Sequence, residues 1–479
     1  MQLVAYGAQD IYLTSNPQIT FFKVVYRRHT NFSREVIEQT FTGTAGAGKT
    51  INVTISRNGD LVHKLYLETP EQTACGTSLN KCHNPGHSMI EHVELEIGGQ
   101  TIDKIYGHWM EVWARLSLPN ETKVVGRITG TGHDLYSQVN GVDGTVTVNS
   151  VIGSYADGIS GVADELESIA NGSHVTVHYP STRYQSMAGG GGISNHNPDS
   201  TGHEGGSVPT HIEDFTVPLP FWFCKSPGLA LPLIALQYHE VKIKLTFSER
   251  GYFLKHGTNN GPKVWAEYIY LDTPERRRFA QGTHEYLIEQ LQRFSTQSTA
   301  PPSSGSLCDA TLDLDFNHPV KELIISGDFY DEDNTFGVLP GIANKDTKVT
   351  LQLNGHDRFS ADRRWSYFSK TQIYEHHTGP GNLYGAFEGI ISKNRGLAED
   401  TDTVDYAKSE QIGVYSFALK PEEHQPSGTC NFSRIDSTRL ILSGLFSGQG
   451  GSAINIVVYA VNYNVLRIMS GMGGLAYSN

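Results

Sequence analysis

The chain has 479 residues, which is more than one hydrophobic core usually serves, so we expect two domains of roughly 200 to 250 residues each. Its 37 basic and 50 acidic residues give a net charge of -13, which argues against a direct nucleic-acid partner because neutralising phosphates requires clustered Lys and Arg. The 50 glycines exceed the usual share of roughly 7% and cluster between alternating segments, a composition typical of loop-rich all-β proteins.

Five cysteines, an odd number at uneven spacing, do not match a secreted disulfide framework and indicate synthesis in a reducing compartment. The first ten residues lack a basic start and an apolar run. The longest apolar stretch, residues 229–236, is interrupted by Pro232 and falls far short of the roughly 20 residues that span a bilayer. We therefore expect neither a signal peptide nor a membrane anchor.

Strict alternation of apolar and polar residues is the strongest local signal, because successive side chains of a strand face opposite sides of a sheet. Ile51, Val53 and Ile55 alternate with polar residues, and the same pattern recurs further along the chain. About eight strands are predicted in the first half, near residues 35–42, 50–57, 61–68, 90–104, 174–179, 215–223, 239–247 and 264–271. Eight antiparallel strands in two facing sheets make a jelly roll.

Residues 43–50 have the sequence GTAGAGKT, which matches the nucleotide-binding pattern G-x-x-x-x-G-K-[ST]. Phosphate binding needs a helix directly after this loop, because the helix N-terminus supplies the amides that cradle the phosphates. Residues 51–56 are instead β-branched at alternate positions and predict a strand. We interpret the segment as a hairpin loop that matches the nucleotide-binding pattern by chance.

One helix is expected in the first half. Trp109, Val112, Trp113 and Leu116 follow helical spacing, and Pro119 would end the helix. We interpret it as a helix that caps one end of a sandwich with its tryptophans in the core, and the alternative is an aromatic binding platform.

Two long irregular stretches, residues 126–214 and 376–411, are expected on the surface, where water can satisfy their backbone groups. A charged run at residues 273–278 interrupts the strand alternation. We place the domain junction between Asp272 and His284 for this reason.

The second half repeats segments of the first in the same order. Four pairs of segments correspond: 34–39 with 285–290, 93–100 with 349–356, 241–245 with 438–442, and 265–271 with 454–460. Because collinear self-similarity rarely arises otherwise, these pairs predict two tandem domains of one architecture. The middle strands of the second domain are expected near residues 372–374 and 387–391.

Candidate metal ligands gather in one predicted loop: Cys75, Cys82, His83 and His87. Their spacing is not that of the usual zinc ligand pairs, so we favour a free loop thiol with solvated histidines. His376 and His377 are likewise expected to be exposed. No metal and no cofactor is predicted.

Acidic clusters at residues 331–333 and 399–402 offer oxygen ligands for calcium, although solvated loops are the favoured interpretation. The sequence has no G-x-S-x-G motif, and a carboxylate pair for glycoside hydrolysis depends on proximity in space that sequence does not reveal. Asn120 and Asn171 are candidate glycan sites within sequons, which matter only if the protein meets the secretory machinery.

Segments distributed from one end of the chain to the other carry a family resemblance: residues 2–10, 16–28, 227–241, 425–436 and 462–477. They resemble the major capsid proteins of large icosahedral nucleocytoplasmic DNA viruses, especially those of algae and protists. The resemblance implies a double jelly roll that trimerises into a pseudo-hexagonal capsomer, and capsomers that tile an icosahedral shell around an internal membrane. It implies a structural protein and no enzyme.

The resemblance also implies a division of the chain: an N-terminal arm at 1–25, a first jelly roll at 26–274 with the surface loop 126–214, a linker at 275–284, and a second jelly roll at 285–479 with the surface loop 376–411. The arm is expected at the base of the capsomer. Its candidate assembly residues are Tyr6, Asp10, Phe21, Phe22, Tyr26 and Arg27.

The partners that the resemblance implies are two further copies in a homotrimer, neighbouring capsomers, minor capsid proteins and the penton protein. The internal membrane layer beneath the shell is an indirect partner. The protein is expected in the outer capsid shell of the virion, after assembly in the host cytoplasm.

Two other classes of function compete with this interpretation. A two-module β-sandwich lectin would bind sugar or calcium through its loops, and its glycan binding would be lost with a chelator. A glycoside hydrolase on a jelly roll would lose polysaccharide turnover when two neighbouring carboxylates are mutated.

Overall fold

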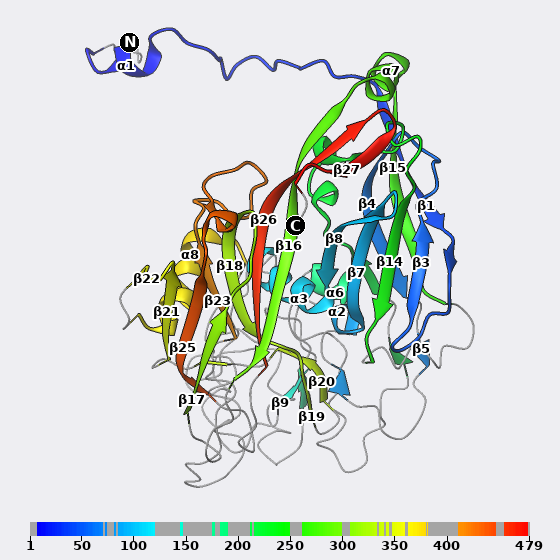
Figure 1. Cartoon of the computed structure of the whole chain (residues 1–479). Helices are drawn as coiled ribbons and strands as arrows, with labels where there is room; N and C mark the ends of the chain where they lie inside the picture. The colour runs from blue at the N-terminus through cyan, green and yellow to red at the C-terminus, as the bar shows by residue number, and fades with distance from the viewer. Residues whose placement is uncertain are drawn as a thin grey trace.

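Two β-sandwiches lie side by side in the computed structural model, with an extended N-terminal segment that leaves the first of them (Figure 1). The described residues are 7–69, 72–73, 81–82, 85–119, 144–146, 175–177, 183–189, 211–212, 215–249, 261–298, 307–332, 335–339, 342–343, 347–359, 363–379, 381, 411–446 and 455–477.

The first sandwich consists of two antiparallel sheets. One has the strand order β1-β15-β4-β12, and the other has the order β2-β3-β14-β7-β8. Their bounds are β1 Phe32–Gln39, β2 Phe41–Thr42, β3 Thr50–Thr54, β4 Leu61–Thr69, β7 Ile90–Ile97, β8 Gln100–Tyr106, β12 Phe215–Pro218, β14 Val241–Phe247 and β15 Lys263–Leu271.

The second sandwich repeats this arrangement. Its sheets have the orders β16-β26-β18-β23 and β17-β25-β21-β22. Their bounds are β16 His284–Gln297, β17 Leu307–Asp313, β18 Pro319–Gly327, β21 Lys348–Leu353, β22 His356–Asp357, β23 Ile412–Ser416, β25 Thr438–Phe446 and β26 Asn455–Met469.

Both sandwiches are jelly rolls of the same topology. The two-residue strand β2 is an addition beside β3 in the first roll. With β2 left out and the eight remaining strands of each roll numbered in chain order, one sheet holds the first, eighth, third and sixth, and the other holds the second, seventh, fourth and fifth. Thus β1 corresponds to β16, β15 to β26, and β8 to β22. The predicted all-β double jelly roll is confirmed.

Short elements connect and decorate the two rolls. They are α1 Asp10–Thr14, β5 Gln72–Thr73, β6 Lys81–Cys82, α2 Pro85–Ser88, α3 Gly107–Ser117, β9 Gly144–Val146, β10 Val175–Val177, α6 Arg183–Ala188, β11 His211–Ile212, η2 Trp222–Cys224, η3 Pro227–Leu229, β13 Leu231–Pro232, α7 Thr273–Gln281, β19 Tyr330–Glu332, β20 Thr335–Val338, η5 Tyr367–Thr371, α8 Gln372–His376, β24 Cys430–Asn431, η7 Phe432–Arg434 and β27 Met472–Leu475.

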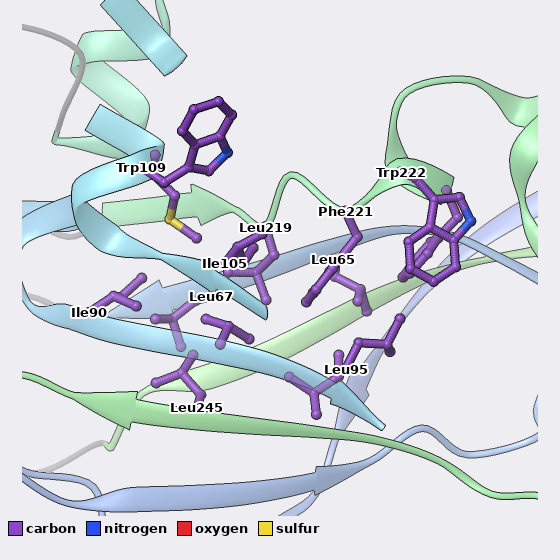
Figure 2. Close-up of a cluster of buried hydrophobic side chains, with 14 of the residues drawn as sticks. Leu65, Leu67, Ile90, Leu95, Ile105, Trp109, Leu219, Phe221, Trp222 and Leu245 are labelled. Carbon is purple, nitrogen blue, oxygen red and sulfur yellow. The ribbon is translucent and has the colours of Figure 1, made fainter. Parts of the chain in front are cut away.

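The period-two patterns build the core between the sheets. Every second residue of β14, from Val241 to Phe247, is buried, while the residues between them are half-buried. Leu65 and Leu67 of β4 pack with Leu95 of β7 in one cluster of buried side chains (Figure 2). A second buried cluster fills the other roll. Hydrophobic burial between paired sheets therefore stabilises each roll.

The four pairs of repeated segments do not all align residue by residue in the structure. In the second and third pairs of segments (93–100 with 349–356, and 241–245 with 438–442) the residues correspond one by one, because Val93 lies opposite Leu245 and Val349 lies opposite Leu442. Both copies also end in a tight turn of residues with positive φ, Gly98 and Gly99 in one, Asn354 and Gly355 in the other.

The first and fourth pairs of segments (34–39 with 285–290, and 265–271 with 454–460) identify corresponding strands, but they imply two different registers between these strands. Arg34 lies opposite Ile269, and its counterpart Glu285 lies opposite Arg467. The fourth pair of segments equates Ile269 with Val458, which lies opposite Phe294 and not opposite Glu285, so the first and fourth pairs cannot both hold residue by residue. The long β26 contains both positions, and apolar alternation alone fits it at several offsets.

Several predicted elements need correction. The single strand near 90–104 is a hairpin of β7 and β8, because Gly98 and Gly99 form a turn. The strand expected near 372–374 is wrong, since α8 begins at Gln372 and buries Ile373. The strand expected near 387–391 lies outside the described residues.

Two interpretations of loop segments can be compared with the structure. The strand β3 follows Lys49 directly, so the GTAGAGKT segment is a loop between strands, as predicted. The charged run at the expected domain junction forms the helix α7, which begins after Asp272 because the Asp272 carboxylate accepts a hydrogen bond from the Thr273 amide.

Alternation on a single strand leads to a stability prediction. Leu95 is fully buried in β7, whereas its neighbour Glu94 faces outward and pairs with Lys104. We expect Leu95→Ala to lower the free energy of unfolding by about 2 to 5 kcal/mol, because it leaves a cavity between the sheets. Glu94→Ala is the matched control and should cost less than about 1 kcal/mol. Denaturant titration measures both, and equal losses would contradict the assignment of faces.

Candidate assembly surfaces

The helix α3 joins the two rolls. Nine of its eleven residues are buried, from Gly107 to Leu116. Trp109 packs against Tyr459 of β26 in the second roll, with ring centroids 5.1 Å apart. The predicted core tryptophan is therefore confirmed for Trp109, and the core in which it lies is shared between the rolls.

A neutral histidine completes this contact. His108 Nε2 lies 2.7 Å from the Gly327 carbonyl oxygen, so it donates there, and Nδ1 accepts from the Tyr459 hydroxyl at 2.8 Å. Burial lowers the pKa of His108 to about 4, which keeps the imidazole uncharged. Each polar atom of the contact thus has a partner in the other roll.

A buried carboxylate on β16 is the centre of a second contact between the rolls. Glu289 forms ion pairs with Lys225 of the first roll and with Lys321 of β18, the latter at 2.9 Å. His424 Nδ1 lies 3.3 Å from the same carboxylate. Burial alone would raise the pKa of Glu289, but the charges of Lys225 and Lys321 and the hydrogen bond from His424 hold it well below its ordinary range.

Beside Glu289 lies a cavity of about 30 Å³, lined by Trp109, Trp222 and Asp103 among others. The Asp103 carboxylate accepts the backbone N–H of Leu291 across the junction at 3.3 Å. Burial raises the pKa of Asp103 to about 7. A cavity of this size has room for water but not for a substrate, since small-molecule sites usually measure at least about 300 Å³.

The chain after α8 fastens the second roll to the end of α3. Gly379 and Gly381 donate backbone N–H groups to the carbonyl oxygens of Leu116 and Arg115, at 2.7 and 2.8 Å. These carbonyls belong to the last turn of α3, where the helix itself offers no donors. A Cβ on Gly379 would lie 2.4 Å from the Arg115 oxygen, so the contact requires glycine.

His377 supports this connection from inside. Its Nε2 lies 3.1 Å from Glu322, and its Nδ1 lies 3.1 Å from Glu422. Burial lowers the pKa of His377, but the two carboxylates outweigh burial and raise it to about 9, so the imidazole is charged at neutral pH. The next residue, Thr378, donates its hydroxyl to the Ser117 carbonyl oxygen at 2.9 Å.

The C-terminal hairpin of β26 and β27 reaches back to the first roll. Tyr238 donates its backbone N–H to the Gly471 carbonyl oxygen at 3.0 Å, and His239 Nδ1 lies 3.0 Å from the Gly473 oxygen. At the opposite end, β20 of the second roll pairs in parallel with β6 of the first. The rolls are therefore joined at both ends and in the middle.

Two histidine predictions are wrong. His87 is fully buried, with Nδ1 2.8 Å from Glu111 and Nε2 2.9 Å from the Tyr184 hydroxyl. His377 is buried too, in the contact with Glu322 and Glu422. Sequence offered no signal for either, because most of their partners are distant in the chain.

Several other candidate ligands and glycan sites fall outside the part of the chain that the structure describes. Cys75 and His83 lie outside the described residues, as do the candidate glycan sites Asn120 and Asn171. Among the residues that are described, no group of three His, Cys, Asp or Glu side chains is arranged to hold a metal ion. Within the same part of the chain, no helix is both long and apolar enough to cross a membrane.

The N-terminal segment extends away from both rolls and carries α1 at its far end (Figure 1). Asp10 accepts the Gly7 backbone N–H at 2.6 Å and thereby fixes the start of α1. Phe21, Phe22 and Tyr26 are 88%, 98% and 86% exposed, and Arg27 is exposed as well. Tyr6 lies outside the described residues.

Large apolar side chains rarely gather on a solvated segment unless a partner covers them. Nine residues of this segment are of this kind: Ile11, Tyr12, Leu13, Ile19, Phe21, Phe22, Val24, Val25 and Tyr26. The segment therefore presents an exposed apolar surface that the described parts of the two rolls do not cover.

Two jelly rolls of one topology fixed side by side, with an exposed apolar segment at the N-terminal side, have the architecture of a double jelly-roll capsid protein. Residues 20–153 and 182–272 match the family described as the N-terminus of major capsid proteins, and residues 275–384 and 407–474 match the large eukaryotic DNA virus major capsid proteins. The chain belongs to this family of major capsid proteins.

Relatives match over the whole length. The chain is 43% identical to the major capsid protein of Pyramimonas orientalis virus and 35% identical to that of Paramecium bursaria Chlorella virus 1, covering 100% of this chain and 99% of each relative. It also resembles a chain of the quasi-atomic PBCV-1 virus capsid, with a TM-score of 0.65, 32% identity, and coverage of 96% of this chain and 100% of that chain.

The Glu289 contact generates a prediction about the junction. Replacing Glu289 with Gln leaves the buried Lys321 without its counter-charge, which typically costs about 3 to 5 kcal/mol of stability. Because the folded pKa of Glu289 lies below its ordinary value of 4.5, its contribution is present above that pH and is lost as the pH falls. Denaturation of both proteins at pH 7 and in acid measures the difference.

Glu285→Gln on the same strand is the matched control, because Glu285 forms an exposed pair with Arg467. It should cost less than about 1 kcal/mol. A loss at Glu289→Gln no larger than the control would contradict the role assigned to this contact.

The contribution of His377 to stability should depend on pH in the opposite direction to that of Glu289. Its folded pKa of about 9 lies above its ordinary value of 6.5, so its charge stabilises the fold fully below pH 6.5 and ceases to do so as the pH rises through 9. We expect His377→Asn to lose about 3 kcal/mol at pH 6 and much less at pH 10. His376→Asn, at the half-buried neighbour, is the matched control, and in thermal denaturation at pH 6 it should cost less than His377→Asn.

Proposed function

We propose that three copies of this chain form a pseudo-hexagonal capsomer and that these capsomers tile the outer icosahedral shell of a large DNA virus. The observation that carries the proposal is the shared topology of the two rolls. Three chains with two equivalent rolls each present six similar lateral units, so an object with three-fold symmetry can pack in a hexagonal lattice.

The rigid junction supports this role. A tile must keep its outline when it joins a lattice, and the two rolls share buried side chains of one core. Contacts within the trimer are expected to be obligate and to bury upwards of roughly 2,000 Å² each, whereas contacts between capsomers are smaller and more polar. Many weak lateral contacts then hold the shell together.

The arm, residues 1–25, serves assembly at the base of the capsomer in this proposal. Its partners are neighbouring capsomers, minor capsid proteins and the penton protein, with the internal membrane layer beneath them. Exposed apolar side chains at Phe21 and Phe22 support such a role, because burying them on a partner gains free energy. The rolls themselves are 26–274 and 285–479, separated by a linker that includes most of α7.

Assembly in the host cytoplasm is part of the same proposal. Cys224, Cys308 and Cys430 are free thiols in the structure, and the burial of Cys224 raises the pKa of its thiol to about 12. Unpaired cysteines in an inert, protonated state suit a reducing compartment.

Light scattering of the purified chain tests the trimer. We expect a mass about three times 52.7 kDa, and negative-stain images of three-fold particles with a near-hexagonal outline. A protein lacking residues 1–25 should still be a trimer of the correspondingly shortened chain, because the arm extends away from the rolls, but should no longer assemble with its partners. A monomeric full-length chain would overturn the proposal.

A further inference from the structure

Two segments of the chain carry the same short pattern: two arginines, then any residue, then a hydroxyl side chain. They are residues 27–30, with the sequence RRHT, and residues 363–366, with the sequence RRWS. Protein kinases choose their substrates partly by charge, and two arginines before a serine or threonine fit an acidic substrate groove through charge-assisted hydrogen bonds. Thr30 and Ser366 are therefore two candidate phosphate acceptors.

The second copy of the pattern is locked in the fold. Trp365, which separates the arginines from Ser366, is fully buried, and Ser366 itself is half-buried directly before η5. The Arg363 guanidinium lies over the Tyr367 ring, 3.7 Å from its centroid. Because phosphoryl transfer needs the acceptor oxygen in line with the γ-phosphorus, this segment would have to unwind and remove Trp365 from the core to enter a kinase.

The first copy of the pattern is accessible. Residues 24–31, here called the connecting segment, link the arm to β1 and contain neither helix nor strand. Every residue of the pattern is exposed, from Arg27 to Thr30. His29 Nδ1 donates to the Thr30 carbonyl oxygen at 2.7 Å, a contact that does not use the Thr30 hydroxyl. A kinase can therefore bind this segment without disturbing either roll.

Thr30 lies at the same end of the sheet as α7. Phe32, the first residue of β1, pairs with Leu271, the last residue of β15. Thr30 precedes this pair by two residues, and α7 begins at Thr273, two residues after it. The connecting segment and α7 thus leave the sheet side by side, and in Figure 1 the chain before β1 passes beside α7.

The charges of these two neighbours have the same sign. The connecting segment carries the two arginines of the pattern, while three arginines at 276–278 and one glutamate give α7 a net charge of +2. Of these arginines, Arg276 pairs with Asp60 at 2.9 Å, and the other two are exposed. Like charges repel, so the unmodified segment has no electrostatic reason to pack against α7.

A phosphate on Thr30 reverses this relation. It adds a charge of about -1.5 to -2 at pH 7, and its oxygens accept paired hydrogen bonds from guanidinium groups. The exposed arginines of α7 are in position to receive it, because the helix and the connecting segment start from one paired position of the sheet.

We propose that Thr30 is the acceptor of a protein kinase that selects basic segments, and that its phosphate pairs with Arg277 and Arg278 and holds the connecting segment against α7. In the transfer, the Thr30 hydroxyl oxygen forms a bond to the γ-phosphorus of Mg²⁺-bound ATP, the bond from that phosphorus to the β–γ bridging oxygen breaks, and ADP and the hydroxyl proton are released. This inference goes beyond the proposed function and does not depend on the trimer. The modification controls how freely the arm reaches a partner.

Phosphorylation of the full folded chain by a purified kinase of this class, with Mg²⁺ and ATP, tests the site. Peptide mass spectrometry should find about 80 Da added at Thr30 and nothing at Ser366, whereas the denatured chain should be modified at both. Thr30→Ala should remove the incorporation, and Ser366→Ala, the matched control, should keep it. Arg27→Ala with Arg28→Ala should lower kcat/KM at least about 10-fold. Modification of the folded chain at Ser366, or its absence at Thr30, would overturn the inference.

Hydrogen exchange tests the pairing with α7. In the phosphorylated chain, the amides of residues 24–31 should exchange at least about 5-fold more slowly than in the unmodified chain. Arg277→Gln with Arg278→Gln should still accept the phosphate but lose this protection. Arg439→Gln, at an exposed arginine of the second roll, is the matched control and should retain it. Equal exchange in the phosphorylated and unmodified chains would overturn the pairing.

Discussion

Burial of α3 between the two rolls is the constraint on which the rest of the structure depends. A helix with nine of eleven residues buried must have partners on nearly every side, and here they come from both sandwiches. Trp109 of α3 contacts Tyr459. Backbone N–H groups of the second roll donate hydrogen bonds to carbonyl oxygens in the last turn of α3. Each roll could fold around its own sheets, but α3 has its complete environment only when the rolls are in one fixed orientation.

Polar contacts define that orientation more than they add stability. Desolvating Glu289 and Lys321 costs free energy that their attraction only partly returns, so a buried pair of this kind is a weak source of net stability. A displaced orientation would leave these charges buried without partners. Other orientations of the two rolls are therefore higher in free energy, and a single orientation gives the protein the constant outline that a lattice tile requires.

The sequence predicted the sheets well and the junction poorly, for a physical reason. Alternation and turn chemistry are local, so the strand after Lys49 and the turn at Gly98 could be identified from a few residues. His377 and Glu322 are 55 residues apart, and His108 and Tyr459 are 351 apart. No local pattern reports such pairs, and histidines that looked solvated are buried. The expected strand at 372–374 failed similarly, because burial of Ile373 against the roll favours a helix there.

The two rolls share a topology but not strand lengths, and the difference follows from their positions in the chain. The strands β16 and β26 have 14 and 15 residues, whereas their counterparts β1 and β15 have eight and nine. Of the two corresponding strands β1 and β16, it is β16 that the other roll of the same chain covers. Among the described residues β1 pairs only with β15 and is otherwise mostly exposed, and it is shorter and carries Arg34 and Glu35 among its apolar residues, as edge strands in contact with water usually do. Duplication within one polypeptide thus allows the internal junction to become buried and charged, while the edge at β1 keeps a mixed polar and apolar surface.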